Sequence, residues 1–193
     1  DQNTQVREMI RLINACCDNI TAEKLPTIDL EYLFLQIRIK SVGETSDIIM
    51  NCDQCETENS VTVDLEAAEV KRDKEVSNIV KLTDDISIEL QFTTYEAMKG
   101  LDISTEETNT KEAFQLIQRC ITSVVQGDEV FTQDDFTEKE LEKFMDSMSL
   151  EMLEGVQDYL ASAPTLSVSA EFKCKTCDNE QKTTLEGIGN FFD

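Results

Sequence analysis

Four cysteines form two pairs with a spacing that is typical of metal ligands. Two residues separate Cys52 from Cys55, and the same spacing separates Cys174 from Cys177. One such pair can be a redox centre, half of a metal site or neither. Two pairs supply the four thiolates that hold a zinc ion in a closed tetrahedral site, which leaves no position open for catalysis. The pattern therefore predicts a structural Zn²⁺ site with Cys52, Cys55, Cys174 and Cys177 as its ligands.

The sequences around the two pairs also match, so that a longer motif is repeated. A shift of 122 positions aligns the cysteines of both pairs and places Asn59 on Gln181. Each pair is followed by a short polar turn and then by alternating residues, SVTVDL in the first copy and KTTLEG in the second. Alternation of this kind is typical of a half-buried strand. The repeat predicts two β-hairpins, residues 44–65 and 166–187, that form the two halves of a zinc ribbon.

A thiol redox centre is one alternative to a metal site for these pairs. A thioredoxin-like CxxC motif lies between a strand and a helix, whereas neither pair here has a helical context. The other cysteines, Cys16, Cys17 and Cys120, lie in segments with a helical apolar pattern, and we interpret them as packing residues. The total of seven cysteines is odd, and the N-terminus has no signal-peptide pattern. Both features predict a reducing cytosolic environment.

The charge of the chain limits the classes of partner that it is expected to bind. There are 17 Lys and Arg residues against 40 Asp and Glu residues, which gives a net charge of −23. A zinc ribbon that binds nucleic acid is the second alternative, but phosphate binding requires clustered Lys and Arg. The basic residues here are scattered among acidic ones, so we expect no nucleic-acid binding. No apolar run approaches the ~18 residues of a membrane span, so we expect no membrane association either.

Catalytic motifs are missing from the sequence. The chain contains no histidine, which excludes Ser-His and Cys-His nucleophile pairs and histidine-bound catalytic metals. The sequence also has no glycine-rich phosphate-binding loop. We therefore expect neither enzymatic activity nor a small-molecule substrate, and we assign no catalytic residue.

The remaining segments predict an α+β fold in a single domain of residues 1–193. Apolar spacing predicts N-terminal helices within residues 1–43, and alternation on both sides of a Thr-Asp-Asp turn predicts a β-hairpin at residues 78–92. Residues 93–163 are expected to form a helical insertion between the ribbon halves. The predicted fold is a zinc-ribbon-like pair of CxxC β-hairpins with a small additional antiparallel sheet and a helical bundle.

Two features inside the insertion give more detailed expectations. Apolar residues at helical spacing, from Phe114 to Val124, predict a helix over residues 112–125. Thr137 is followed three residues later by Glu140, which is the pattern of a capping box at the start of a helix.

Two short stretches are candidates for contact with a protein partner. Phe191 and Phe192 follow small residues at the end of the sequence, and such aromatic side chains can anchor in a pocket of a partner. They can equally fold back over the helices of their own chain. Arg38 and Lys40 stand out as basic residues in an acidic chain, and the alternative for them is pairing with nearby acidic groups.

The order of these segments resembles that of a phage protein family. DLEYLFLQIRIKSVGE is followed by a CxxC hairpin, VKLTDDISIELQF, LIQRCITSVVQGDEVF, DFTEKELEKFMDSM and a second CxxC hairpin that ends in LEGIGNFF. Together they look like the baseplate hub assembly protein family of T-even-type contractile-tailed bacteriophages. The similarity runs from about Asp29 to Phe192 and rests on the combination of segments. The zinc prediction does not depend on it, because members of that family vary in these cysteines.

The resemblance implies a non-enzymatic role in building the central hub of the tail baseplate. The expected partners are phage baseplate hub proteins, which the protein would meet in the host cytoplasm during assembly. Two possibilities stay open: the protein is a component of the virion tail baseplate, or it acts transiently as an assembly chaperone.

Overall fold

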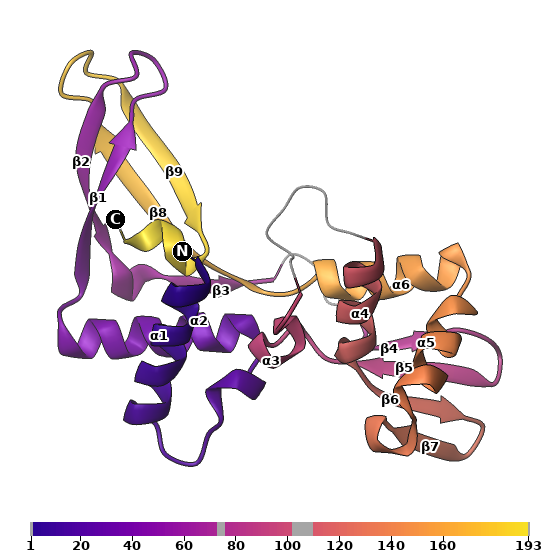
Figure 1. Cartoon of the computed structure of the whole chain (residues 1–193). Coiled ribbons are helices and arrows are strands. Elements are labelled where there is room, and N and C mark those ends of the chain that lie inside the picture. The colour runs from indigo at the N-terminus through magenta and orange to yellow at the C-terminus, as the bar shows by residue number, and fades with distance from the viewer. Residues whose placement is uncertain (1, 73–75, 102–109, 193) are drawn as a thin grey trace. The chain divides into compact units, whose positions relative to one another are not determined.

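The computed structural model describes residues 2–72, 76–101 and 110–192, which form helices and small antiparallel sheets (Figure 1). This mixture confirms the predicted α+β class. The chain divides into two units. Unit 1 contains Asp1–Ala22, Ile28–Arg72 and Pro164–Asp193, and unit 2 contains Glu23–Thr27 and Asp73–Ala163.

Unit 1 combines helices with two small sheets. Its helices are α1 (Gln2–Cys16) and α2 (Thr27–Ser41, of which Thr27 is assigned to unit 2). Between them in the sequence lies a 3₁₀ turn, η1 (Ala22–Lys24), of which only Ala22 is assigned to unit 1. Its strands are β1 (Thr45–Asn51), β2 (Glu58–Asp64), β3 (Glu69–Lys71), β8 (Thr165–Lys173) and β9 (Glu180–Glu186). Two further 3₁₀ turns are η2 (Leu65–Ala67) and η4 (Ile188–Phe191). β1 pairs with β2, and β8 lies between β3 and β9.

The hairpins β1–β2 and β8–β9 have the same strand register. Thr45 pairs with Asp64 in the first hairpin, and the residues 122 positions later, Ser167 and Glu186, pair in the second. Every later pair in the first hairpin also has its equivalent 122 positions later, up to Asn51–Glu58 and Lys173–Glu180, the last pairs before the CxxC turns. The predicted pair of CxxC hairpins is therefore confirmed.

A buried apolar cluster joins the two hairpins of unit 1 at the end away from the CxxC turns. Strand β2 alternates between exposed and buried residues and contributes Val61 and Val63, whereas β8 contributes Leu166, Val168 and Ala170. The other members of the cluster are Leu35 of α2, Ile48 of β1, Leu65 of η2 and Phe191 of η4. Burial of one such side chain contributes about 1.5–3 kcal/mol to stability. The hairpins are thus held together independently of their cysteines.

The chain leaves unit 1 and returns to it at neighbouring positions. Lys71, the last residue of β3, pairs with Thr165, the first residue of β8. Strand β3 was not expected from the sequence, because three residues are too few to give a recognisable strand pattern. This short ladder closes the base of the long segment between the two hairpins.

Unit 2 is built around a four-stranded antiparallel sheet in the order β4-β5-β6-β7. The strands are β4 (Ile79–Lys81), β5 (Ile86–Leu90), β6 (Ile121–Gln126) and β7 (Glu129–Thr132). The helices are α3 (Tyr95–Met98), α4 (Thr110–Cys120), α5 (Glu138–Asp146) and α6 (Leu150–Ala161), with a 3₁₀ turn η3 (Gln133–Asp135). Side chains of the sheet and of α4, α5 and α6 form the core, in which Phe92 stacks on Tyr159 with ring centroids 4.7 Å apart.

The helix predicted over residues 112–125 is wrong in its second half. α4 ends at Cys120, and β6 begins at the next residue, Ile121. The sequence ITSVV contains four β-branched residues, which favour an extended backbone. Pairing with β5 on one side and β7 on the other then decides the conformation.

The hairpin predicted at residues 78–92 is consequently part of a larger sheet, and residues 93–163 are not helical throughout. Residues 102–109 of this insertion lie outside the described part.

The capping box at the start of α5 is confirmed. The hydroxyl of Thr137 accepts a hydrogen bond from the backbone N–H of Glu140 at 3.4 Å, and the carboxylate of Glu140 accepts one from the backbone N–H of Thr137 at 2.8 Å. The same carboxylate also accepts a hydrogen bond from the Thr137 hydroxyl, and these bonds lower the pKa of Glu140.

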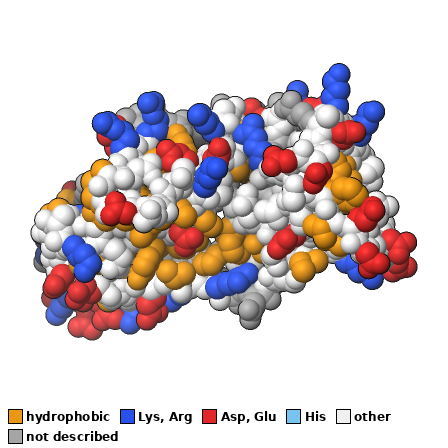
Figure 2. All heavy atoms as spheres, turned by 90° about the horizontal axis from the view of Figure 1, so that it is seen from below, with side chains coloured by type: hydrophobic (Ala, Val, Ile, Leu, Met, Phe, Trp, Pro, Cys, Tyr) orange, Lys and Arg blue, Asp and Glu red, His pale blue; other side chains and the backbone are white. Residues whose placement is uncertain are grey.

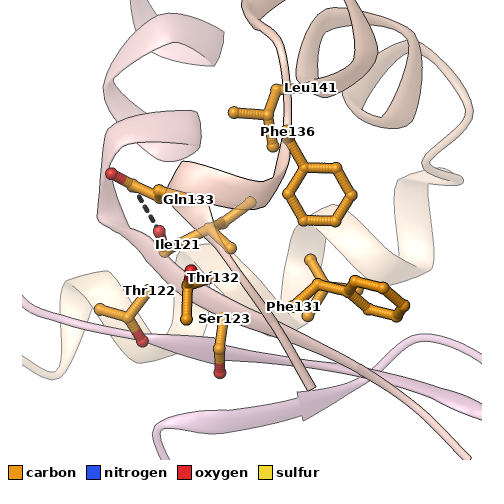
Figure 3. Close-up of a pocket in the computed structure, with 9 residues that line it drawn as sticks. Ile121, Thr122, Ser123, Phe131, Thr132, Gln133, Phe136 and Leu141 are labelled. Atoms are coloured by element: carbon orange, nitrogen blue, oxygen red, sulfur yellow. Dashed lines mark hydrogen bonds between the residues drawn. The ribbon is translucent and has the colours of Figure 1, made fainter. Parts of the chain in front are cut away.

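A shallow surface hollow in unit 2 contains no ionisable lining residue. Figure 3 shows the side chain of Gln133 directed at the carbonyl of Ile121, to which it donates a hydrogen bond. The lining residues are Ile121, Thr122, Ser123, Val124, Phe131, Thr132, Gln133, Phe136 and Leu141. The hollow therefore offers no acid, base or charged metal ligand.

The surface carries many exposed charges. Acidic and basic side chains are both exposed on the face shown in Figure 2. Ion pairs such as Lys173–Asp178, at 3.1 Å, lie on the exposed surface, where a pair typically contributes ~0–1 kcal/mol. Within the three described ranges, no helix is long and apolar enough to cross a membrane.

Candidate metal centre

The four paired cysteines lie together at the tips of the two hairpins. Their sulfur atoms are all within 4.8 Å of one another. The closest contacts join the two hairpins, with 3.6 Å between the sulfurs of Cys52 and Cys177 and 3.6 Å between those of Cys55 and Cys174. Residues more than a hundred positions apart in the sequence thus form one cluster of thiols, as the repeated motif predicts.

The spacing of the sulfurs fits a tetrahedral metal ion. Zinc–thiolate bonds of about 2.3 Å in a tetrahedron place the sulfurs about 3.8 Å from one another. The observed contacts of 3.6 Å and the upper limit of 4.8 Å bracket this value. Four thiolates without a carboxylate or imidazole suit zinc or iron and do not suit magnesium or calcium, which prefer oxygen ligands.

Each CxxC turn has the same backbone conformation. In the first, the N–H of Cys52 donates to the carbonyl of Thr57 at 3.0 Å; in the second, the N–H of Cys174 donates to the carbonyl of Asn179 at 2.8 Å. The residue after the second cysteine is left-handed in both copies, with φ of 57° at Glu56 and 60° at Asp178. A short turn of this kind directs both sulfurs of a pair to the same side, which a metal site requires.

The two sulfurs of each pair differ in burial. Cys52 and Cys174, the first cysteine of each pair, are each 1% exposed. Cys55 is exposed and Cys177 is half-buried. The cluster is thus closed toward the protein interior and accessible at the tips of the turns, so that a metal ion could enter from solvent.

Hydrogen bonds give these thiols different acidities. Backbone N–H groups, that of Cys177 above all, lower the pKa of Cys174 to about 6. The hydroxyl of Thr57 lowers the pKa of Cys55. The backbone of Asn179 also lowers the pKa of Cys177, but desolvation and the neighbouring sulfurs outweigh it and raise that pKa to about 12. The lowered pKa of Cys174 favours the thiolate, which is the form that binds a divalent cation, and thiols that still carry a proton release it when the cation binds.

Side-chain amides connect the hairpins around the sulfur cluster. The amide oxygen of Asn59 accepts the backbone N–H of Lys175 at 3.0 Å, and the amide oxygen of Gln181 accepts the backbone N–H of Asp53 at 3.2 Å. Sequence reasoning did not assign these two residues to the site. The available signal was their alignment at the shift of 122 positions, which places Asn59 on Gln181 and Asp53 on Lys175.

Phe191 and Phe192, candidates either for a partner contact or for packing on their own chain, contact their own chain. Phe191 is 0% exposed and belongs to the core of unit 1. Phe192 is half-buried, and its ring meets Phe34 edge to face at 6.0 Å. Of the two alternatives for this pair, the structure has the one in which the aromatic residues fold back.

The basic candidates on α2 differ from each other. Arg38 is half-buried and donates hydrogen bonds to the carbonyls of Gly43 at 2.8 Å and Thr45 at 3.3 Å. Lys40 is exposed. Arg38 therefore has a role in its own unit, and Lys40 has the more accessible side chain.

The three cysteines outside the cluster occupy different environments. Cys120 is buried at the end of α4, and burial raises its pKa. This agrees with the packing role expected for it. Cys17 is half-buried and Cys16 is exposed, so the packing interpretation of Cys16 is wrong. Cys16 is the last residue of α1 and does not lie on the buried side of that helix.

Comparison with known proteins identifies a family over the full length of the chain. The family model described as T4 bacteriophage base plate protein matches residues 1–193. Comparisons with curated proteins and with solved structures give no match. The match includes both CxxC hairpins and the segment between them.

Proposed function

Because the chain belongs to the family of T4 bacteriophage base plate proteins, we propose that it acts in the tail baseplate of a contractile-tailed phage as a non-enzymatic, protein-binding factor. The observation that carries this proposal is the family match over all residues 1–193. The chain's own chemistry supports it, because the described part has a four-cysteine cluster that suits a structural metal ion and the sequence has no histidine for acid–base catalysis.

The specific task proposed is assembly of the central hub. In this role the protein binds baseplate hub proteins in the host cytoplasm, and it then either remains in the tail or leaves before the virion is complete. The acidic surface, with a net charge of −23, supports attraction to basic surfaces on its partners.

Co-expression with the baseplate proteins of the same phage tests this role. The expected result is a stable complex with one of the hub proteins, recovered by size-exclusion chromatography. Mass spectrometry of purified tails then distinguishes a virion component from an assembly chaperone. Failure to form a complex with each baseplate protein, singly and in combination, would contradict the proposal.

The thiol cluster is assigned a structural role in which Cys52, Cys55, Cys174 and Cys177 bind one Zn²⁺. The tetrahedral spacing of the sulfurs and the match between the two turns support this assignment. When bound, the ion links the tips of the hairpins, whose bases are already joined by the apolar cluster. Its bonds to four thiolates leave no coordination position for a substrate.

Metal analysis of the purified protein tests the assignment. One zinc per chain, with none of the four thiols reactive until a chelator is added, is the expected result. One iron per chain would support a metal site at the four cysteines but would contradict the assignment of zinc as its metal. Absence of metal together with a disulfide within either pair would instead favour the thiol redox alternative.

A partner surface on α2 is part of the same proposal. Lys40 is exposed near the end of this helix, and Tyr32, on the same helix, is 43% exposed. Arg38 and Phe192 contact each other, and Phe191 is buried in the core of unit 1, so these three residues are less available to a partner than Lys40. Lys40→Glu is expected to weaken the complex with the hub protein and leave the melting temperature unchanged. Lys24→Glu, also at an exposed position, is the charge-matched control.

A further inference from the structure

Two asparagines reach from one hairpin to a buried sulfur of the other. The amide nitrogen of Asn59, in the first hairpin, lies 3.8 Å from the sulfur of Cys174. The amide nitrogen of Asn179, in the second, lies 4.0 Å from the sulfur of Cys52. The two sulfurs that receive these contacts are the buried ones of each pair. Each sulfur that solvent cannot reach thus has an N–H donor supplied by the opposite hairpin.

The position of Asn59 is the better defined of the two. Its side chain is buried, with 4% exposure, and all its polar atoms have partners. The amide nitrogen also donates to the carbonyl of Thr57 at 2.7 Å, and the amide oxygen accepts the backbone N–H of Lys175 at 3.0 Å. The opposite orientation would place the amide oxygen against a carbonyl and a sulfur, which are both acceptors. The N–H must therefore point at Cys174.

We propose that Asn59 is a positioning residue of the metal centre, which holds the Cys174 thiolate with its amide N–H and fixes the opposite turn with its amide oxygen. This rests on the proposed metal site. Four thiolates and one divalent cation have a net charge of −2, so donors to sulfur stabilise the loaded site. Cys174 also receives the backbone N–H of Thr176 at 3.5 Å, and the backbone N–H of Cys177 lowers its pKa, so that several donors converge on one buried sulfur.

Gln181 provides a matched comparison within the same molecule. It occupies the position equivalent to Asn59 in the repeat and also accepts a backbone N–H from the opposite turn. Its described contacts do not include a sulfur. Asn59→Asp and Gln181→Glu each keep the acceptor oxygen and add one negative charge. Only Asn59→Asp replaces an N–H donor to sulfur by a carboxylate oxygen.

The experiment measures the affinity of the full-length protein and these variants for Zn²⁺ and Co²⁺ by competition with a chromophoric chelator. Removal of a group that supports a metal ligand typically weakens metal binding by about 10- to 100-fold. Asn59→Asp is expected to show a loss of this size, and Gln181→Glu a much smaller one. The sulfur-to-cobalt charge-transfer band is expected to shift in Asn59→Asp and to stay in place in Gln181→Glu.

The outcomes separate this inference from the metal site itself. Equal effects of the two charge variants, or none, with an unchanged cobalt spectrum, would overturn the role of Asn59 and leave the site intact. A wild-type protein with four free thiols that binds neither metal would overturn the site and this inference together. If Asn59→Asp does not fold, as judged by circular dichroism, Asn59→Ala and Gln181→Ala are compared by the same measurements, with the same criteria.

Discussion

The guanidinium of Arg38 lies over the ring of Phe192, 5.7 Å from its centroid. Arg38 belongs to α2 and Phe192 follows η4, so this contact joins the first part of unit 1 to its last. Phe34, one turn earlier on α2, meets the same ring, and Leu35 shares the buried cluster with Phe191. The C-terminal segment is thus part of the fold of unit 1.

Loss of the buried aromatic ring is expected to destabilise unit 1 far more than loss of its neighbour. Phe191→Ala removes a fully buried side chain, for which about 3–5 kcal/mol of unfolding free energy is the usual loss. Phe192→Ala removes one cation–π contact and one edge-to-face contact, together worth about 1–2 kcal/mol. Urea denaturation followed by circular dichroism measures both. Equal losses would contradict the different burial of the two rings.

Loss of one cysteine ligand is expected to lower metal content and stability together. Cys174→Ser removes the sulfur with the most hydrogen-bond donors. At free metal 100 times above the dissociation constant, binding contributes about 2.7 kcal/mol to folding, and the variant should lose that contribution. Elemental analysis and thermal melting measure the two effects. Cys16→Ser, at an exposed position outside the cluster, is the control. Complete loss of metal with an unchanged melting temperature would show that the site has no structural role.

Neutralising Glu31 is expected to stabilise unit 1 at neutral pH. Burial raises the pKa of this carboxyl, although the backbone N–H of Ile188 lowers it in part. Because the pKa of Glu31 is higher in the folded protein than in the unfolded chain, its contribution to stability is complete below about pH 4.3, the pKa of a glutamate in the unfolded chain. That contribution is lost as the pH rises through the pKa of Glu31 in the folded protein. Glu31→Gln removes the charge and keeps an acceptor for Ile188.

The gain from Glu31→Gln should therefore be present at pH 7 and disappear near pH 4. Denaturation midpoints at these two pH values measure it, and Glu44→Gln, at an exposed position, shows the effect of charge alone. A gain that does not depend on pH, or a loss at pH 7, would contradict the desolvation of Glu31.

Enlarging Gly155 is expected to disturb the contact between α6 and β4. A Cβ atom at this position would lie 3.0 Å from Cγ1 of Val80, so a larger side chain would force the two elements apart. Gly155→Leu should cost about 1–3 kcal/mol, as overpacking usually does. In Gly155→Ala, the higher helix propensity of alanine, worth up to about 1 kcal/mol, offsets part of the crowding. Glu154→Leu, on the exposed side of the same helix, should change stability by less than about 0.5 kcal/mol. A Gly155→Leu variant as stable as wild type would show that α6 does not pack closely on β4.

The cysteine cluster could be predicted because its information is local and repeated. The spacing of Cys52 and Cys55 is compatible with half of a metal site, and the second pair, in a matching sequence, supplies the other half. The amide of Asn59 could not be assigned in this way. Which polar side chain reaches the opposite turn depends on how β2 packs against β8, and that packing involves residues far apart in the sequence.

Strand β6 shows a second reason why prediction from the sequence fails. Ile117, Ile121 and Val124 have helical spacing, but only the first of them lies in α4. The β-branched residues after Cys120 favour a strand, and the partners that stabilise it, β5 and β7, are recognised only once the sheet is assembled. The capping box at Thr137 was predictable, because all of its atoms lie within one turn of the chain.

The ladder that pairs Lys71 with Thr165 has a consequence for insertions and deletions in the chain. Everything between these two residues begins and ends at one place on unit 1, so changes in its length do not alter the distance that the chain must span. Shortening or replacing this segment is therefore compatible with an unchanged geometry of the paired turns that carry the cysteines.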